Sequence, residues 1–205
     1  MNPHFIFNSL NSIQHYIIQE DAENANLYLA KFAQLIRRIL DNSKKKQISL
    51  REEIDTLTLY LNLEKLRFED NFDFELIKSK NLDQNEIMIP PMLTQPFVEN
   101  AIWHGLMPLK GKGLLKIKFI LLGQIMTISI EDNGIGRKKA SQRKRIGGNT
   151  PTGLKNVTER IALLNKTGDG KINCHIIDLN KPDGTPTGTR VELMIPILHS
   201  DEKRE

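Results

Sequence analysis

The sequence predicts an α+β protein in which an N-terminal helical segment precedes a two-layer sandwich, a mixed sheet with helices on one face. Before residue 70, apolar residues recur at helical spacing, and this part contains no Gly and a single Pro. After Phe68 the pattern changes to strand-like alternation, and later strands are separated by helical stretches. We therefore expect a helical part over residues 1–69, a sandwich over 70–199 and a disordered tail over 200–205.

Three helices are expected between residues 4 and 68. The third begins with a capping box, in which Ser49 and Glu52 each satisfy one free backbone amide at the helix start. The apolar stripes of the three helices are, in order, Ile6, Leu10, Ile13 and Ile17; Ala25, Leu29, Phe32, Ile36 and Ile39; and Leu50, Ile54, Leu57 and Leu61. The first two stripes exceed what one copy would cover, so a homodimeric helical bundle is expected.

The second part alternates strands and helices. A helix is expected to begin at Thr94 as its cap, with Pro96 in its first turn and Gly105 past its end. Two strands turning at Gly123 form a hairpin. The stretch from Asn133 to Thr152 is Gly-rich, basic and poor in apolar residues, so we expect a long loop that is either a functional lid or a mobile, solvated connection. The other expected elements are strands over 72–76, 87–89, 114–122, 124–132, 171–178 and 188–195, and a helix over 153–165.

Composition excludes several classes of protein. The 205 residues carry a formal charge of +4, and the two basic clusters, over 44–46 and 137–145, contain no aromatic residue for base stacking, which disfavours nucleic-acid binding. No apolar stretch approaches the ~20 residues that cross a bilayer, and the first residues lack a secretory signal. Cys174 is the only cysteine, so an internal disulfide is excluded and a reducing, cytoplasmic compartment is expected.

Two glycine-rich stretches suggest a nucleotide site. In the run from Asp132 to Gly136, a carboxylate at a strand end could accept a hydrogen bond from an exocyclic amine, and the glycines would let a flat ligand approach the backbone. Gly153 begins a helix whose free amides would suit a phosphate. The alternatives are an ordinary turn and an ordinary helix start.

Two histidine-containing segments suggest phosphoryl chemistry. Asn100 and His104 lie one helical turn apart, with Glu99 beside them, and an amide oxygen next to a carboxylate suits Mg²⁺. His4 lies in the first turn of the first helix, where a neutral imidazole could accept a phosphoryl group. The alternative for both segments is a solvated polar helix face.

Taken together, these segments resemble a known family. The run from Asn2 to Asn11 is similar to the phosphoacceptor box of LytS/YehU-type sensor histidine kinases, and Tyr60 to Phe68 is similar to the family's linker. Gln95–Gly105, Asp132–Gly136 and Thr152–Asn156 resemble, in the same order, the N box and the two glycine boxes of the GHKL-type ATP-binding domain, which these kinases share with gyrase and with chaperones and mismatch-repair proteins. The resemblance spans residues 2 to about 196.

The resemblance implies ATP and Mg²⁺ as cofactors and a role for each matching residue. His4 would be autophosphorylated, and an aspartate of a response regulator would then receive the phosphoryl group. Asn100 would bind Mg²⁺ and Asp132 would read the adenine amine. His104 would lie near the nucleotide and Thr189 would support adenine recognition. Gly134, Gly136 and Gly153 would shape the lid and the phosphate-binding turns.

The sequence also departs from the family's pattern. Trp103 stands where many relatives have a basic residue, and Pro151 stands where a first glycine is common. Pro96 replaces the acid that serves as the base in ATPase relatives, which favours phosphoryl transfer over hydrolysis. Glu99 is the nearest carboxylate that could assist His4.

We therefore expect the catalytic portion of a sensor histidine kinase of a two-component system. Because the family has membrane-spanning sensor segments upstream, this portion is expected to be the cytoplasmic segment of an inner-membrane protein that does not itself contact the membrane. The alternative is a GHKL nucleotide-binding module that does not phosphorylate itself, acting as a scaffold or an ATPase. A third possibility, DNA binding through the basic loop, predicts an affinity that falls steeply with salt.

Overall fold

The computed structural model describes residues 3–68, 71–147, 159, 161–166 and 171–197. The chain forms two compact units, which are described separately below. The first consists of Met1–Asp70 together with Met88–Leu93, and the second of Asn71–Ile87 together with Thr94–Glu205. The domain bounds proposed from the sequence stay a prediction.

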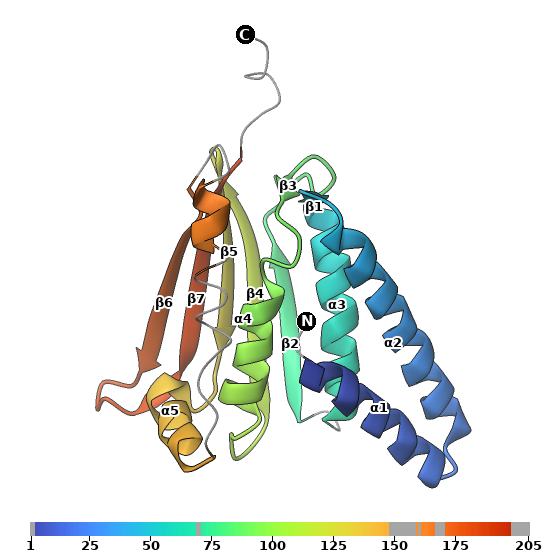
Figure 1. The fold of residues 1–205 in the computed structure, drawn as a ribbon. Helices are drawn as coiled ribbons and strands as arrows, with labels where there is room; N and C mark the ends of the chain where they lie inside the picture. Colours follow the sequence, from blue (N-terminus) through green and yellow to red (C-terminus); the bar gives the residue numbers. More distant parts are fainter. Residues whose placement is uncertain (1–2, 69–70, 148–158, 160, 167–170, 198–205) are drawn as a thin grey trace. The chain divides into compact units, whose positions relative to one another are not determined.

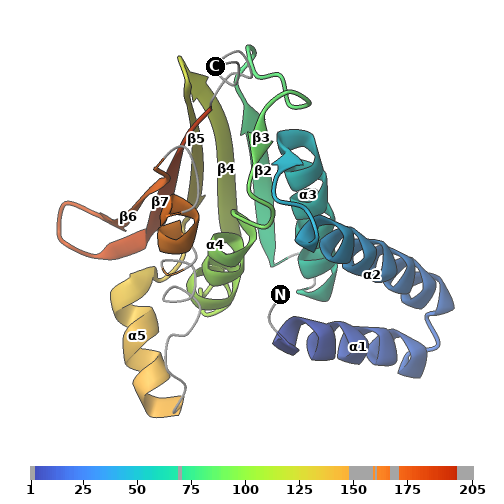
Figure 2. The same cartoon turned by 45° about the horizontal axis from the view of Figure 1, so that its top comes forward.

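The first unit is built on three helices: α1 (Pro3–Ile18), α2 (Ala22–Ser43) and α3 (Leu50–Arg67). They confirm the three helices expected from the sequence. Asp21 caps α2 by accepting a hydrogen bond from the Asn24 N–H at 3.1 Å, which satisfies one of the free amides of the first turn. α1 and α2 are joined by a short turn and run side by side (Figures 1 and 2), and α2 packs on α3.

The buried face of α1 differs from the expected one. Phe5, Ser9 and Ile13 are buried, whereas Ile6 and Leu10 are exposed by 39% and 50%. The expected stripe shares only Ile13 with the buried face, because Phe5 packs its ring against Tyr60 at a centroid distance of 5.2 Å and so rotates the helix. In α3 the expected stripe of Leu50, Ile54, Leu57 and Leu61 is buried throughout and is confirmed.

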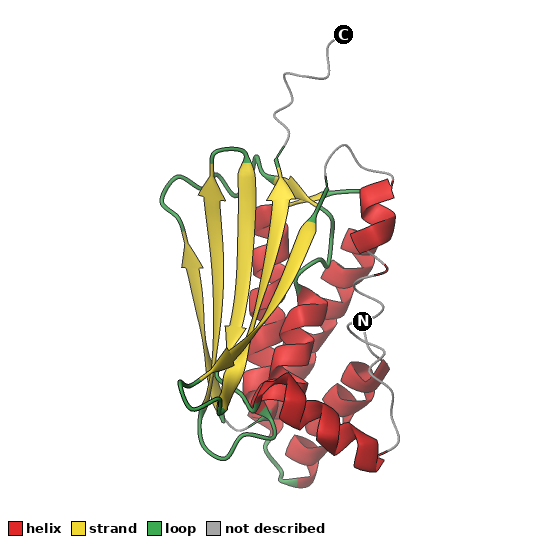
Figure 3. Cartoon of the chain, turned by 90° about the vertical axis from the view of Figure 1, so that its left-hand side faces the viewer, coloured by secondary structure: helices red, strands yellow, loops and turns green. Residues whose placement is uncertain are grey.

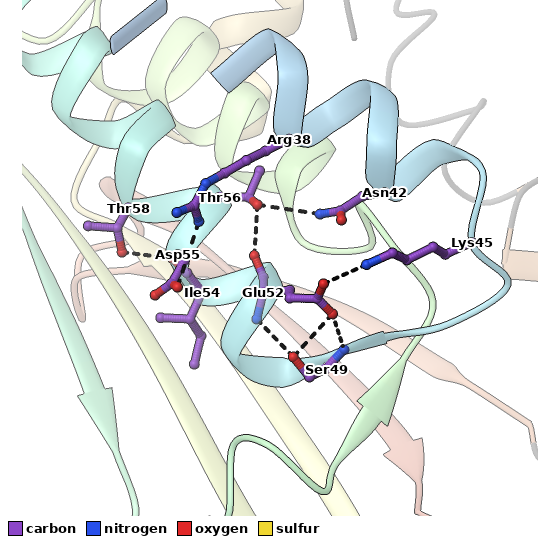
Figure 4. A network of polar contacts seen from close by, with 9 residues as sticks. All are labelled: Arg38, Asn42, Lys45, Ser49, Glu52, Ile54, Asp55, Thr56 and Thr58. Carbon is purple, nitrogen blue, oxygen red and sulfur yellow. Dashed lines mark hydrogen bonds and ion pairs between the residues drawn. The ribbon is translucent and has the colours of Figure 1, made fainter. Parts of the chain in front are cut away.

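The capping box of α3 is confirmed. The Glu52 N–H donates to Ser49 Oγ at 3.2 Å, and the Ser49 N–H donates to Glu52 Oε2 at 2.9 Å (Figure 4). Lys45 Nζ donates to the other carboxylate oxygen at 2.6 Å, and this bond, with that of the Ser49 N–H, holds the pKa of Glu52 below its usual range. The box therefore joins the start of α3 to the segment that follows α2.

We expect Ser49→Ala to lower the free energy of unfolding by about 1 kcal/mol, because the Glu52 N–H loses its side-chain acceptor, the Ser49 hydroxyl. Urea unfolding followed by helical circular dichroism measures this change. Ser43→Ala is the control, since the Ser43 hydroxyl donates only to the carbonyl of Leu40 on an exposed helix end. An equal loss in both variants would contradict a specific role for the cap.

The first unit also contains a two-stranded antiparallel sheet of β1 (Ile48–Ser49) and β3 (Met88–Ile89). Ile48 is registered with Ile89, and both side chains are fully buried. The chain thus returns to the helical unit for six residues, Met88–Leu93, before it enters α4 (Gln95–Asn100) of the second unit.

The second unit contains a mixed five-stranded sheet in the order β2-β4-β5-β7-β6, which confirms the predicted α+β fold (Figure 3). β2 and β4 are parallel, and the other neighbours are antiparallel. The predicted hairpin is β4–β5, with Gly123 in a left-handed turn at φ 58°. The bounds of the strands are Phe72–Lys78 for β2, Gly113–Leu122 for β4, Ile125–Asp132 for β5, Asn173–Asn180 for β6 and Pro186–Pro196 for β7.

One face of this sheet carries the core of the second unit. Alternate residues of the three central strands are buried, as the period of a strand with one covered face requires. These are Leu115, Ile117 and Phe119 of β4, Met126, Ile128 and Ile130 of β5, and Val191, Leu193 and Ile195 of β7.

The helices of the second unit correct two expectations. The helix expected from Thr94 to Gly105 is α-helical only in α4 (Gln95–Asn100) and continues as a π-helix, η1 (Ala101–Leu106). Thr94 occupies the N-cap position, yet within the described residues its side chain makes no capping hydrogen bond. η1 packs against β4, β5 and β7.

The second correction concerns the expected lid loop. Gly136–Gly147 form a helix, α5, at the end of the sheet where β6 ends and β7 begins (Figure 2). Its arginines, lysines, alanine and glutamine favour a helix. The segment has no apolar stripe, however, so apolar periodicity does not predict this helix from the sequence. Residues 161–166 are helical, and the rest of the helix expected over 153–165, apart from Glu159, lies outside the described residues.

Candidate functional site

The site is centred on Asp132, the last residue of β5. Its side chain is only 4% exposed, and Oδ1 accepts a hydrogen bond from the Gly134 N–H at 2.9 Å. Burial raises the pKa of this carboxyl from 3.8 to about 6, because the charged form loses its hydration, although the backbone N–H groups of Gly134 and Thr189 act in the opposite direction. Thr189 is the cross-strand partner of Asp132 on β7. The predicted residues Asp132, Gly134 and Thr189 thus lie together.

Glycines from three segments lie so close to their neighbours around Asp132 that a side chain would not fit at any of them. A Cβ on Gly105 would lie 2.7 Å from Asp132 Oδ1, and one on Gly188 would lie 1.8 Å from the Asp132 carbonyl oxygen. A Cβ on Gly134 would lie 2.3 Å from the backbone of Gly105, whose carbonyl accepts the Ile135 N–H at 3.1 Å. The backbone of η1 therefore lies against the turn after β5, beside the Asp132 carboxylate, and the start of β7 lies against the Asp132 backbone.

The turn after Asp132 is held to the neighbouring strand. Asn133 Oδ1 accepts the Leu114 N–H at 2.7 Å, and the Asn133 N–H donates to the Leu114 carbonyl at 3.2 Å. Gly136 then adopts a left-handed conformation at φ 74°, where a Cβ would lie 2.8 Å from the ring of Pro186. This conformation turns the chain sharply from the strand into α5.

The other predicted site residues of this unit lie on α4 and η1. Gln95 Nε2 donates to Glu99 Oε1 at 3.0 Å, and burial raises the pKa of Glu99 despite this bond. Asn100 Nδ2 donates to the Pro96 carbonyl at 2.8 Å, which leaves its side-chain oxygen as the acceptor or ligand atom. His104 is half-buried in η1.

The π-helical geometry of η1 is set by i→i+5 hydrogen bonding. The Met107 N–H donates to the Ile102 carbonyl at 2.8 Å. Such short π-helical segments occur frequently at functional sites. Here the segment carries His104 and brings Gly105 against Asp132.

α5 is joined to β6 by a bidentate ion pair. Arg137 Nε and Nη2 donate to the two carboxylate oxygens of Asp178 at 2.7 and 2.8 Å. The pair raises the pKa of Arg137 and lowers that of Asp178, because each charge stabilises the other. Arg137, the first cation of the expected lid, is thus engaged by Asp178 in this structure.

We expect Arg137→Gln to increase amide exchange of the first turn of α5 by about two- to fivefold, since a partly exposed ion pair of good geometry contributes less than about 1 kcal/mol. Hydrogen exchange with mass spectrometry of peptides over 136–147 measures this increase. Lys139→Gln is the control, because it removes an equal charge from the same helix and leaves the Arg137–Asp178 pair intact. The double variant Arg137→Asp with Asp178→Arg should restore slow exchange. If Arg137→Gln does not speed exchange and the double variant does not slow it, the ion pair does not anchor α5.

Two predicted site residues are not described fully. His4 lies in the first turn of α1, and the placement of its side chain is outside the description. Gly153 lies outside the described residues. Among the described residues, no group of three or more His, Cys, Asp or Glu side chains could hold a metal ion, so an Mg²⁺ site would need phosphate oxygens in addition to Asn100.

Sequence reasoning missed Gly105, Gly188 and Asp178 as parts of this site. The sequence predicts Gly105 as the end of a helix and of the N-box run, not as a neighbour of Asp132, and it does not single out Gly188. The left-handed φ of 142° at Gly188 is a signal that only the backbone shows. No sequence pattern connects Asp178 with Arg137, because 41 residues separate them.

None of the helices in the described part of the chain is both long enough and apolar enough to span a membrane.

Comparison with known proteins identifies relatives over most of the chain. The histidine kinase family model matches residues 1–72. The sensor protein LytS of Staphylococcus epidermidis is 29% identical over 204 residues, which make up 99% of this chain and 33% of that protein. LytS of Oceanobacillus iheyensis is 31% identical over 96% of this chain and 33% of its own length. The sensor histidine kinase YpdA of Escherichia coli is 33% identical over 80% of this chain and 29% of its own length.

Among solved structures, the mycobacterial sensor histidine kinase MprB has a TM-score of 0.48 at 15% identity, over 74% of this chain and 96% of that one. A similarity at this level carries no argument about function. The curated relatives, by contrast, align with both units, and the family model matches the helical one. The chain therefore belongs to the LytS-type sensor histidine kinases, and it spans about a third of the length of the curated relatives that it matches.

Proposed function

We propose that this chain is the phosphoacceptor and ATP-binding portion of a two-component sensor kinase. It would phosphorylate itself on His4 with ATP and pass the phosphoryl group to an aspartate of a response regulator. The observation that carries the proposal is the buried Asp132 carboxylate at the end of β5, which lies against Gly105 and accepts the Gly134 N–H. A site of this kind suits one face of a flat ligand with an amine at its edge.

The residues present fit an adenine nucleotide. A buried carboxylate with a free lone pair accepts a hydrogen bond from the exocyclic amine of adenine, and the glycines keep side chains away from the ring. The Asn100 side-chain oxygen would hold Mg²⁺, which would neutralise charge on the phosphates. His104, Thr189, Gly136 and Gly153 would complete the nucleotide site.

In the proposed reaction the His4 imidazole is the nucleophile. A ring nitrogen forms a bond to the γ-phosphorus, the bond from that phosphorus to the bridging oxygen breaks, and ADP leaves with the electron pair. The proton on the other ring nitrogen passes to a base, and Glu99, whose pKa is raised by burial, would be that base. Phe5, buried against Tyr60, holds the backbone next to His4 in place.

The proposal includes a homodimer through the helical unit. Exposed apolar side chains along α1 would be covered by a second copy. The most exposed are Phe7, Leu10, Ile17 and Ile18. The segment would lie on the cytoplasmic side of an inner-membrane sensor protein.

Incubation with Mg²⁺ and γ-labelled ATP tests the proposed reaction. Label that is lost in acid and kept in alkali is expected for the natural chain, and none is expected for His4→Ala or Asp132→Asn, because one lacks the nucleophile and the other the adenine contact. His15→Ala is the control. His15 lies on the same helix but is not the proposed phosphoacceptor, so this variant should take label as the natural chain does.

Label retained by His4→Ala would contradict the assignment of His4. Binding of ATP without any label would favour the non-phosphorylating scaffold. Release of inorganic phosphate without label would favour an ATPase, although Pro96 occupies the place of the expected base.

A further inference from the structure

A second carboxylate, outside the nucleotide site, is buried in the first unit. Glu53 lies in the first turn of α3 and is 3% exposed. Its Oε2 accepts a hydrogen bond from the backbone N–H of Met92 at 3.0 Å. A buried carboxylate is costly unless it is hydrogen-bonded, so this contact is strongly favoured once Glu53 is buried.

The residue that Glu53 holds has an unusual backbone. Met92 adopts a left-handed conformation at φ 56°, which non-glycine residues rarely adopt. Such a conformation persists only where its surroundings fix it. Here the Glu53 carboxylate and the buried side chain of Leu93, which is 1% exposed, provide that constraint.

The whole segment Met88–Leu93, which we call the clasp segment, is fixed to the helical unit in three ways. β3 pairs with β1 directly before α3, Ile89 is fully buried opposite Ile48, and Glu53 holds the Met92 amide. The Ser49–Glu52 capping box fixes the same end of α3. The beginning of α3, β1 and the clasp segment thus form one connected structure.

The clasp segment leads directly into the proposed nucleotide site. Only Leu93 and Thr94 separate Met92 from α4, and α4 carries Glu99 and Asn100. A displacement of the first turn of α3 would therefore be passed to the start of α4 through the chain itself. Asp132, Gly134 and Thr189, which would contact the adenine, are not carried by α4 but lie on β5, in the turn after it and on β7.

We propose that Glu53 is a positioning residue that couples the helical unit to α4 by holding Met92. The consequence of this coupling rests on the proposed function. The coupling sets the rate of phosphoryl transfer to His4 and leaves the affinity for ATP unchanged. Glu53 contacts neither substrate nor reacting atoms in this account. It acts through the backbone that leads to Glu99 and Asn100.

Glu53→Ala tests the proposal, with Glu52→Ala as the matched control. Both variants remove a glutamate from the first turn of α3, but Glu52 bonds to Ser49 and Lys45 and not to Met92. We expect Glu53→Ala to speed amide exchange over 92–98 by about tenfold or more, from the loss of a charge-assisted hydrogen bond, and Glu52→Ala to leave it within about twofold. Glu53→Gln keeps an acceptor oxygen and should restore slow exchange.

The kinetic readout separates positioning from general damage. Glu53→Ala should lower the rate of autophosphorylation by about tenfold at saturating ATP, while the dissociation constant for ATP changes by less than about twofold. Should Glu53→Ala fail to fold, Glu53→Asp withdraws the carboxylate by one methylene and gives the same comparison.

Equal effects of Glu52→Ala and Glu53→Ala would overturn the proposal, because any loosening of α3 would then suffice. A parallel loss of ATP affinity and transfer rate in Glu53→Ala would also overturn it. If the natural chain takes no label, only the proposed function is contradicted. Amide exchange over 92–98 in Glu52→Ala and Glu53→Ala then decides whether Glu53 holds the start of α4.

Discussion

Replacing Asp132 with asparagine is expected to lower the affinity for adenosine by about 10- to 150-fold at pH 7.5, the effect of losing a charge-assisted hydrogen bond of about 1.5–3 kcal/mol. Asparagine has nearly the same shape but presents an NH₂ group where the carboxylate has an acceptor. An amine of the ligand would then meet a donor in a site that is closed to water, since Asp132 is 4% exposed. The steric fit stays the same, so the loss reports the charge and the acceptor.

The same carboxyl predicts how binding depends on pH. The pKa of Asp132 is raised to about 6, so the group carries a proton for much of the time below this pH. An amine donor favours the ionised form, and binding should therefore weaken as the pH falls from 7 to 5 and release a proton near pH 6. Asp132→Asn should bind adenosine weakly and without this pH dependence.

Calorimetric titration with adenosine between pH 5 and 8 measures both effects. Adenosine is preferred to ATP because it has no phosphate that titrates in the same range. Repeating the titration in two buffers of different ionisation enthalpy counts the protons released. An affinity of the natural chain that is constant from pH 5 to 8 would show that Asp132 does not contact the ligand.

The raised pKa also has a consequence for stability in the absence of ligand. The native state binds the proton more tightly than the unfolded chain, whose carboxyl has a pKa of 3.8, so the free energy of unfolding falls as the pH rises from about 4 to about 6. The difference between about 6 and 3.8 corresponds to a decrease on the order of 3 kcal/mol, and Asp132→Asn should lack it.

The regular elements of this protein follow from its sequence because local periodicity and burial agree there. The stripe of α3 and the alternation of β4 and β5 each place apolar residues on one covered face, and the Ser49–Glu52 box needs only residues that are close in sequence. Motif order likewise led to Asp132, Gly134 and Thr189, which the structure brings together.

The remaining features depend on contacts between distant parts of the chain. Phe5 rather than Ile6 is buried because Tyr60 of α3 lies opposite it. α5 has no apolar stripe from which the sequence could predict it. Asp178, which pairs with its Arg137, lies on β6, far away in the sequence. The change from α4 to the π-helix η1 brings Gly105 against Asp132, a tertiary constraint that a helical pattern does not contain.

The close backbone approach between Gly134 and Gly105 predicts the second large effect. Gly134→Ala is expected to abolish adenosine binding, because its Cβ would lie 2.3 Å from the carbonyl carbon and oxygen of Gly105. Contacts this short with backbone atoms are relieved only by moving one segment, and overpacking of this kind costs about 1–3 kcal/mol or more. The movement would break the hydrogen bond from the Gly134 N–H to Asp132 Oδ1.

Gly123→Ala is the matched control for this substitution, since the two glycines are required for opposite reasons. Gly123 has a left-handed φ of 58° with nothing within 4 Å of a Cβ, whereas Gly134 has an ordinary φ and no space. Gly123→Ala should therefore lower the melting temperature through backbone strain of about 1 kcal/mol and leave adenosine binding intact, because Gly123 lies at the other end of β5 from Asp132. Thermal unfolding and calorimetric titration of both variants measure the contrast. Unchanged binding by Gly134→Ala would mean that the junction of Gly105, Gly134 and Asp132 is not where the ligand is held.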